Sequence, residues 1–226
     1  MLILAVDTSG RHGSVALCRG DATNFEVLGL NSLEGGTYSA RLIPAIGDLL
    51  QHAGLTKAQI DGFVVVDGPG SFTGLRVGLS TVKALCEILQ KPLTTMSMLE
   101  ALAITYGKAG ETVTAVLDAS RGEVYVGEYR VSGKSAVVIQ QYIQKLHVFV
   151  ERAESTQSRI LTTFPALAGA LAATSASVIV VDALQADAMA GIGFRKLLAG
   201  ETADPATLDA NYIRRSDAEL FSLPKP

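Results

Sequence analysis

The glycine-rich segment from Asp67 to Gly78 combines residue types and spacings that could do chemistry. It reads Asp-Gly-Pro-Gly-Ser-Phe-Thr-Gly-Leu-Arg-Val-Gly and follows an apolar run. This order predicts the end of a strand, then a tight turn, then the start of a helix. Free backbone amides at a helix start can hold a phosphate or a carboxylate, so Gly68, Gly70 and Ser71 are predicted contacts. The segment lacks the Lys-Ser/Thr ending of a P-loop and the spacing of a dinucleotide fingerprint.

The same segment has a purely structural interpretation. Ser71 or Thr73 would cap the helix, while Gly74 and Gly78, four residues apart, would let another backbone approach closely. The residue pattern leaves both interpretations open.

A second polar turn, Asp7-Thr8-Ser9-Gly10, ends the apolar run that starts at Ile3. Its first three residues are further predicted contacts for a nucleotide or phosphate, with Asp7 positioning a metal-bound nucleotide. The alternative is that Asp7 holds its own turn by accepting backbone amides. No base partner can be assigned to Ser9, Ser71 or Ser97, so no catalytic residue is predicted.

Composition excludes several classes of protein. With 48% hydrophobic residues the chain is too apolar to be disordered, and its 19 basic and 22 acidic residues give a charge of −3, unlike a dedicated nucleic-acid binder. The longest apolar stretch, 166–173, is far shorter than the ~18 residues of a membrane span. The first six residues lack a basic leader, so a cytoplasmic location is expected.

Cysteine and histidine spacing gives no metal or thiol-protease pattern. Cys18 and Cys86 stand alone, and His12, His52 and His147 have no ligand-like spacing, so no metal site is expected.

Hydrophobic periodicity predicts a mixture of strands and helices, and hence an α/β fold. Strands are expected at 3–6, 14–18, 62–66, 112–117, 123–131 and 178–181, and helices at 37–53, 74–90, 166–173 and 183–199. The stretch 132–158 gives no clear pattern.

A short internal repeat suggests two related lobes. The pattern of an apolar strand, Asp-x-Ser, then Arg, Gly and Val begins at Leu4 and again at Ala115. Two lobes with duplicated mixed β-sheets resemble the actin-like, ribonuclease H-like group, whose lobes enclose a nucleotide. The predicted division is 1–98 and 99–226, with a C-terminal tail able to pack back on the first lobe.

Several motifs together resemble the TsaB family, the non-catalytic member of the bacterial tRNA threonylcarbamoyladenosine machinery. The glycine-rich segment is the most diagnostic; the supporting segments are 4–9, 14–17, 97–103, 117–119, 122–125 and 211–214. Tyr38 departs from the family's usual histidine at that place, Ala210 replaces a usual proline near the closing motif, and 132–177 matches nothing recognisable. The histidine pair four apart that binds metal in the paralogue TsaD is missing.

The resemblance implies a scaffold that supports threonylcarbamoyl transfer to the adenosine beside the anticodon of tRNAs reading codons that begin with A. The implied partners are TsaD, as a heterodimer, and TsaE; tRNA would be reached only through the complex, and no membrane is involved. No intrinsic cofactor is implied, and ATP with Mg²⁺ would enter with the assembled complex. The alternative is an independent ATP-binding enzyme of the same fold, such as a kinase or ATPase.

The helices predicted at 37–53 and 74–90 carry more apolar positions than one face against a sheet requires. In the family, the equivalent helices pair with those of a partner as a four-helix bundle, or form a homodimer when the partner is absent. Alternatively, the two helices cover each other. A charge at Gly78 or Ile46 is expected to break the complex. The predicted interface residues are Leu42, Ile46, Leu49, Gly74, Val77, Gly78, Thr81 and Leu85.

Overall fold

Five strands form the sheet of the first of two units in the computed structural model, which describes residues 1–21, 24–155, 158–211 and 213. β1 pairs antiparallel with β2 and parallel with β4, and β5 adds parallel to β4. The strand order is β3-β2-β1-β4-β5, with β1 at Leu2–Asp7, β2 at His12–Gly20, β3 at Phe25–Glu34, β4 at Gly62–Gly68 and β5 at Leu93–Ser97.

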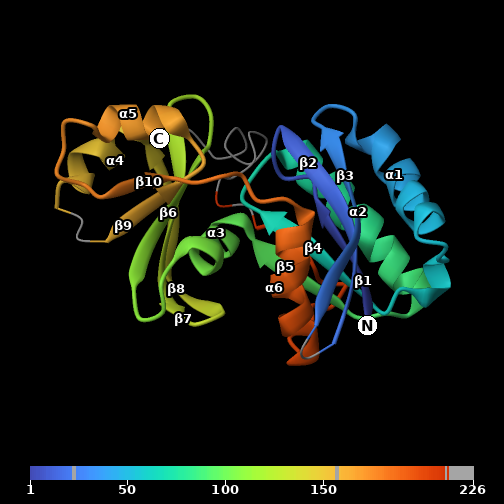
Figure 1. Cartoon of the computed structure of the whole chain (residues 1–226). Coiled ribbons are helices and arrows are strands. Elements are labelled where there is room, and N and C mark those ends of the chain that lie inside the picture. The colour runs from blue at the N-terminus through green and yellow to red at the C-terminus, as the bar shows by residue number, and fades with distance from the viewer. Residues whose placement is uncertain (22–23, 156–157, 212, 214–226) are drawn as a thin grey trace. The chain divides into compact units, whose positions relative to one another are not determined.

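Helices cover both faces of this sheet (Figure 1). α1 (Tyr38–His52) and α2 (Phe72–Leu89) lie on one face, and α6 (Ala186–Leu198) lies on the other. A short 3-10 helix, η1 (Lys57–Gln59), precedes β4. The central strands are buried on both sides, which explains why β4 is an unbroken run of apolar residues rather than an alternating one.

The second unit repeats this design. β6 pairs antiparallel with β7 and parallel with β9, in a sheet ordered β10-β9-β6-β7-β8. α3 covers one face, while α4 and α5 pack on the other around a core that includes Val126, Phe149 and Leu167. The elements are α3 (Met98–Tyr106), β6 (Thr112–Asp118), β7 (Glu123–Ser132), β8 (Ser135–Lys145), α4 (Leu146–Ala153), β9 (Arg159–Thr162), α5 (Pro165–Leu171) and β10 (Val178–Val180).

The two sheets therefore share one topology, because β6 to β10 have the same order and directions as β1 to β5. The predicted α/β class with duplicated mixed β-sheet lobes is confirmed. Sequence periodicity missed β3, β5, α3 and β9, and the unassigned stretch 132–158 contains β8 and α4.

The boundaries of the units differ from a simple division at residue 98. The first unit consists of Met1–Ser97 together with Leu184–Asn211, and Met98–Ala183 belongs to the second. The segment Leu184–Asn211 of the predicted lobe 99–226 thus belongs to the first unit, as the prediction for the C-terminal tail allowed. The reason is packing: α6 buries Met189, Ala190 and Phe194 on the first sheet. None of the described helices is both long and apolar enough to cross a membrane.

Candidate functional site

The two polar turns singled out in the sequence meet at the start of α2. The backbone amide of Ser71 donates to the carbonyl oxygen of Ser9 at 2.6 Å, and the hydroxyl of Thr8 donates to the carbonyl oxygen of Gly74 at 2.8 Å. The Ser71 hydroxyl accepts the amide of Gly74 at 3.3 Å, so Ser71 is the N-cap. The amides of Ser71 and Gly74 at this helix start are thus bonded within the chain.

Three glycines in α2 and in the turn before it make this close approach possible. A Cβ atom at Gly70 would overlap the carbonyl oxygen of Ser9, one at Gly74 would overlap that of Thr8, and one at Gly78 would overlap the Thr8 hydroxyl. The structural interpretation of Gly74 and Gly78 is therefore confirmed: they let α2 lie against the loop after β1.

Asp7 is buried, with 3% of its surface exposed, and it holds its own turn. Its Oδ1 accepts the amide of Ser9 at 2.9 Å and the Ser9 hydroxyl at 2.7 Å. Burial raises the pKa of this carboxyl group, although the two bonds from Ser9 oppose the rise. Tyr38 donates its hydroxyl to the carbonyl oxygen of Gly10 at 2.8 Å, and burial together with the charge of Asp7 raises its pKa to about 12.

The internal repeat is structural as well as sequential. Asp118, at the end of β6, accepts the amide of Ser120 at 2.8 Å, as Asp7 accepts the amide of Ser9. Unlike Asp7, Asp118 is exposed. Its turn continues through three residues with positive φ, Ser120, Arg121 and Gly122.

A residue from far along the chain holds the glycine-rich turn from the other side. The amide of Asn211 donates to the carbonyl oxygen of Asp67 at 2.7 Å. Gly68 has a φ of 138° and precedes a cis peptide bond to Pro69; a Cβ there would approach the Asn211 oxygen at 2.8 Å. Asn211 opens the predicted closing motif, of which Tyr212 and Arg214 lie outside the described residues.

These contacts bring the predicted nucleotide or phosphate residues together at one place. Asp7, Thr8 and Ser9 come from the loop after β1, and Gly68, Gly70 and Ser71 come from the turn between β4 and α2. Contact with a nucleotide or phosphate stays a prediction. Among the residues that the structure describes, no cluster of three or more His, Cys, Asp or Glu is placed to hold a metal ion.

Comparison with known proteins gives a family. A family model described as "TsaD: tRNA N6-adenosine threonylcarbamoyltransferase" matches residues 35–186, which is more than half of the chain. The chain belongs to this family. Members of the family with similar sequences are the TsaB proteins of Bacillus subtilis, 35% identical over 130 residues, and Escherichia coli, 34% identical over 132 residues. The predicted resemblance to TsaB is confirmed.

These alignments cover 58% of this chain and 56% or 55% of the two relatives, so the chain spans little more than half of their length in the match. A solved structure described as YeaZ from Pseudomonas aeruginosa shares the fold more completely. It has a TM-score of 0.73 and 23% identity, and the match covers 93% of this chain and 99% of that one.

The partner surface predicted for this family member needs correction at the residue level. Leu42, Ile46 and Leu49 are 1%, 6% and 5% exposed, because α1 turns them toward β2, β3 and α2. Gly74 and Gly78 are used in packing against Thr8, and Val77, Thr81 and Leu85 are half-buried. A charge at Ile46 or Gly78 would therefore disturb the unit itself. The exposed apolar side chains of the two helices are Ile43, Phe72 and Ile88, at 55%, 39% and 71%.

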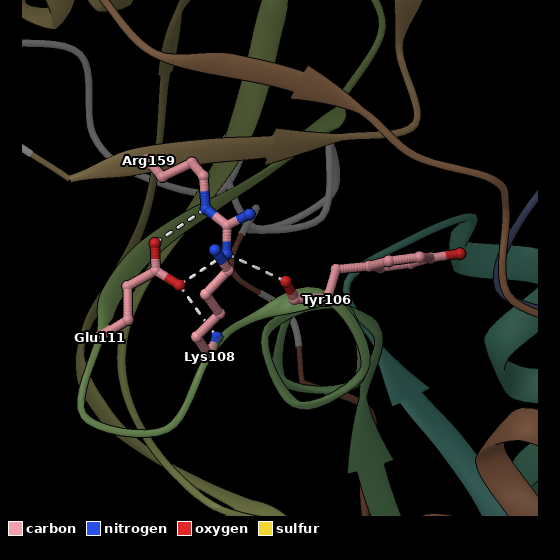
Figure 2. A network of polar contacts seen from close by, with 4 residues as sticks. All are labelled: Tyr106, Lys108, Glu111 and Arg159. Carbon is pink, nitrogen blue, oxygen red and sulfur yellow. Dashed lines mark hydrogen bonds and ion pairs between the residues drawn. The ribbon is translucent and has the colours of Figure 1, made fainter.

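The second unit contains a polar network that the sequence did not reveal (Figure 2). Arg159 donates from Nε and Nη2 to the two carboxylate oxygens of Glu111 at 2.8 and 2.5 Å, and Nη2 also donates to the carbonyl oxygen of Tyr106 at 3.1 Å. The amide of Lys108 donates to Glu111 at 2.9 Å. Hydrogen bonding from Arg159 lowers the pKa of Glu111. The network ties the loop after α3 to the start of β9, and Glu111 and Arg159 are 48 residues apart in the sequence.

Proposed function

We propose that this chain is a non-catalytic partner subunit in the threonylcarbamoylation of tRNA. It would bind a TsaD-type transferase in the cytoplasm, with TsaE joining the complex, and support modification of the adenosine beside the anticodon in tRNAs that read codons beginning with A. The tRNA would be held by the complex rather than by this chain. The match to the threonylcarbamoyltransferase family and the similarity to the TsaB proteins support this role.

One observation carries the non-catalytic part of the proposal. Polar groups of the loop Asp7–Ser9 and of the start of α2 form hydrogen bonds with one another. Ser9 is bonded to Asp7 and to Ser71, and Thr8 is bonded to Gly74. These bonds make the turns a packing junction. The sequence adds that none of its three histidines lies four residues from another, as the metal-binding pair of TsaD does.

The exposed apolar side chains of α1 and α2 support the partner surface. Ile43, Phe72 and Ile88 project from the same two helices that cover one face of the first sheet. Apolar groups of this size on neighbouring helices are the usual centre of a protein interface. The proposed surface consists of Ile43 on α1 and Ile88 on α2, together with the half-buried Val77 and Leu85, which share a side of α2 with Ile88 at helical spacing.

Substitution of Ile43 and Ile88 by glutamate tests the proposal. Each variant should bind the TsaD of the same cell at least about a hundredfold more weakly, because the interface would desolvate an unpaired charge. Val138→Glu is a matched control, since Val138 is 53% exposed but lies in the second unit. Size-exclusion chromatography and tRNA modification by the reconstituted complex are the measurements. If both variants fold and bind TsaD normally, the surface lies elsewhere.

A nucleotide titration of the isolated chain separates this role from the alternative of an independent ATP-binding enzyme. The scaffold role predicts weak binding and no turnover. Tight, magnesium-dependent binding with ATP hydrolysis or phosphate transfer would favour the enzyme, and Asp7→Asn should then abolish it.

A further inference from the structure

The segment from Thr202 to Asn211, here called the strap, crosses the free edge of the first sheet. β5 is an edge strand, and the amide of Ala203 donates to the carbonyl oxygen of Leu93 at 2.7 Å in a single antiparallel bridge. The strap therefore occupies part of an edge that could otherwise pair with another strand.

Two further bonds anchor the strap to the first unit. The ammonium group of Lys83, on α2, donates to the carbonyl oxygen of Leu208 at 2.7 Å, and the amide of Asn211 donates to the carbonyl oxygen of Asp67 at 2.7 Å. Between Ala203 and Leu208 the strap makes bonds of its own, because Asp204 accepts the amide of Ala206 and the hydroxyl of Thr207. The strap can thus keep its local turn when it is not anchored.

Little apolar surface holds the strap down. Ala210 is its one buried residue, whereas Thr202, Asp204, Ala206, Thr207 and Asp209 are exposed. Segments with few buried apolar contacts open at a lower free-energy cost than the core beneath them.

A depression of about 540 Å³ lies where the strap meets α2 and the turn before β5. Residues 202–206 form one wall, and Lys83, Cys86 and Lys91 are among the residues of the other. Cys86 is 4% exposed, and its thiol donates to the carbonyl oxygen of Lys91 at 2.6 Å. A strap that moved away would therefore widen access to this thiol.

We propose that the strap is a latch that opens while the core of the first unit stays folded. Opening bares the edge of β5 and the wall of the depression that α2 forms. It also removes Asn211 from Asp67 and Gly68, so the glycine-rich turn at the start of α2 loses its outer support. The latch thereby couples the edge of the sheet to the turn that precedes a helix of the proposed partner surface.

Thiol labelling of the full chain tests the latch. Cys18 serves as an internal reference, since it is fully buried in β2 and reacts only when the first unit unfolds. In Lys83→Met, which lacks the bond to Leu208, a small methanethiosulfonate reagent should label Cys86 about tenfold faster relative to Cys18, because a hydrogen bond from a charged group is lost. Lys91→Met is the matched control: Lys91 also lines the depression, but its ammonium group lies 4.0 Å from Asp61 rather than on the strap.

Hydrogen exchange supplies a second measurement that does not depend on the reagent. The amides of Ala203 and Asn211 should exchange faster in Lys83→Met, while amides of β1 and β2 keep their wild-type rates. The proposal is overturned if Lys83→Met leaves the ratio of Cys86 to Cys18 labelling unchanged, or if Lys91→Met raises that ratio equally. It is also overturned if wild-type Cys86 reacts as fast as in the unfolded chain, because the strap would then protect nothing.

Discussion

Asp7 and Asp118 show how one side chain serves two environments. Both accept the amide two residues later, but Asp7 is buried and Asp118 is exposed. A buried carboxylate that receives two bonds from Ser9 is adequately held, yet its desolvation still outweighs those bonds and raises its pKa. Asp7 therefore lowers the stability of the fold at neutral pH, because its charged form is solvated in the unfolded chain and is disfavoured by burial in the folded chain.

Asp7→Asn should reveal this cost through its pH dependence. The pKa of Asp7 in the folded chain lies above the ordinary value for an aspartate, so the penalty is full above the folded pKa and fades as the pH falls through it toward the ordinary value. An asparagine oxygen can accept the same bonds without a charge. The variant should be more stable than the wild type at pH 7, by a margin that shrinks toward pH 4.

Urea unfolding of both proteins at several pH values measures that margin. A margin that grows as the pH falls would mean that the bonds from Ser9, rather than burial, dominate at Asp7. Asp118→Asn is the matched control, because it makes the same change at an exposed aspartate of the equivalent turn.

At the scale of elements, the glycines of α2 decide how closely it approaches β1. Gly74 meets the backbone of Thr8, which cannot move aside as a side chain could. Gly47, in α1, has nothing within 4 Å of the place a Cβ would take, so it is not needed for packing. The two helices thus use the same residue type under opposite constraints.

Gly74→Ala should destabilise the first unit by about 1–3 kcal/mol, because the added methyl group forces α2 away from the loop after β1. Gly47→Ala should instead be neutral or stabilising by up to about 1 kcal/mol, since alanine favours a helix and the site is open. Thermal unfolding of the two variants measures the contrast. Equal effects at the two positions would contradict the packing role of Gly74.

At the scale of the whole molecule, α6 returns the chain to the sheet with which it began. Phe194 is 3% exposed and meets Phe25 edge-to-face at a centroid distance of 5.9 Å. A Cβ at Gly193 would overlap Val64, so α6 also approaches the centre of the sheet closely. The first unit is consequently incomplete until the chain has been made as far as α6.

Phe194→Ala should cost about 3–5 kcal/mol in the first unit, as expected for a buried aromatic side chain. Hydrogen exchange should accelerate in β1 and β2, although those strands lie far from the substitution in sequence, and should not change in β6 and β7. Leu198→Ala, at a half-exposed position of the same helix, is the control and should have a small effect. Equal acceleration in both units would show that they unfold together.

Local chemistry made much of the fold predictable. The apolar run before Asp67 gave β4, and Ser71 was recognised as a cap candidate, because strand burial and helix capping depend on neighbours in sequence. β8 escaped prediction because Ser135–Lys145 is an edge strand with exposed Val137, Val138 and Ile139, so its pattern does not alternate. The sequence was sufficient to locate the candidate site, but not to predict the hydrogen bonds between its two turns.

The sequence by itself determined the turns, the caps, the α/β class, the internal repeat and the family, since each is written in residues close together along the chain. Only the tertiary structure decided which side of α1 is buried, that α6 joins the first sheet, and that Asn211 reaches Asp67 and Arg159 reaches Glu111. The reason is that apolar periodicity gives the width of the apolar face of a helix, but does not identify the strand or helix against which that face packs. Contacts between distant residues depend on how all the faces are buried at once.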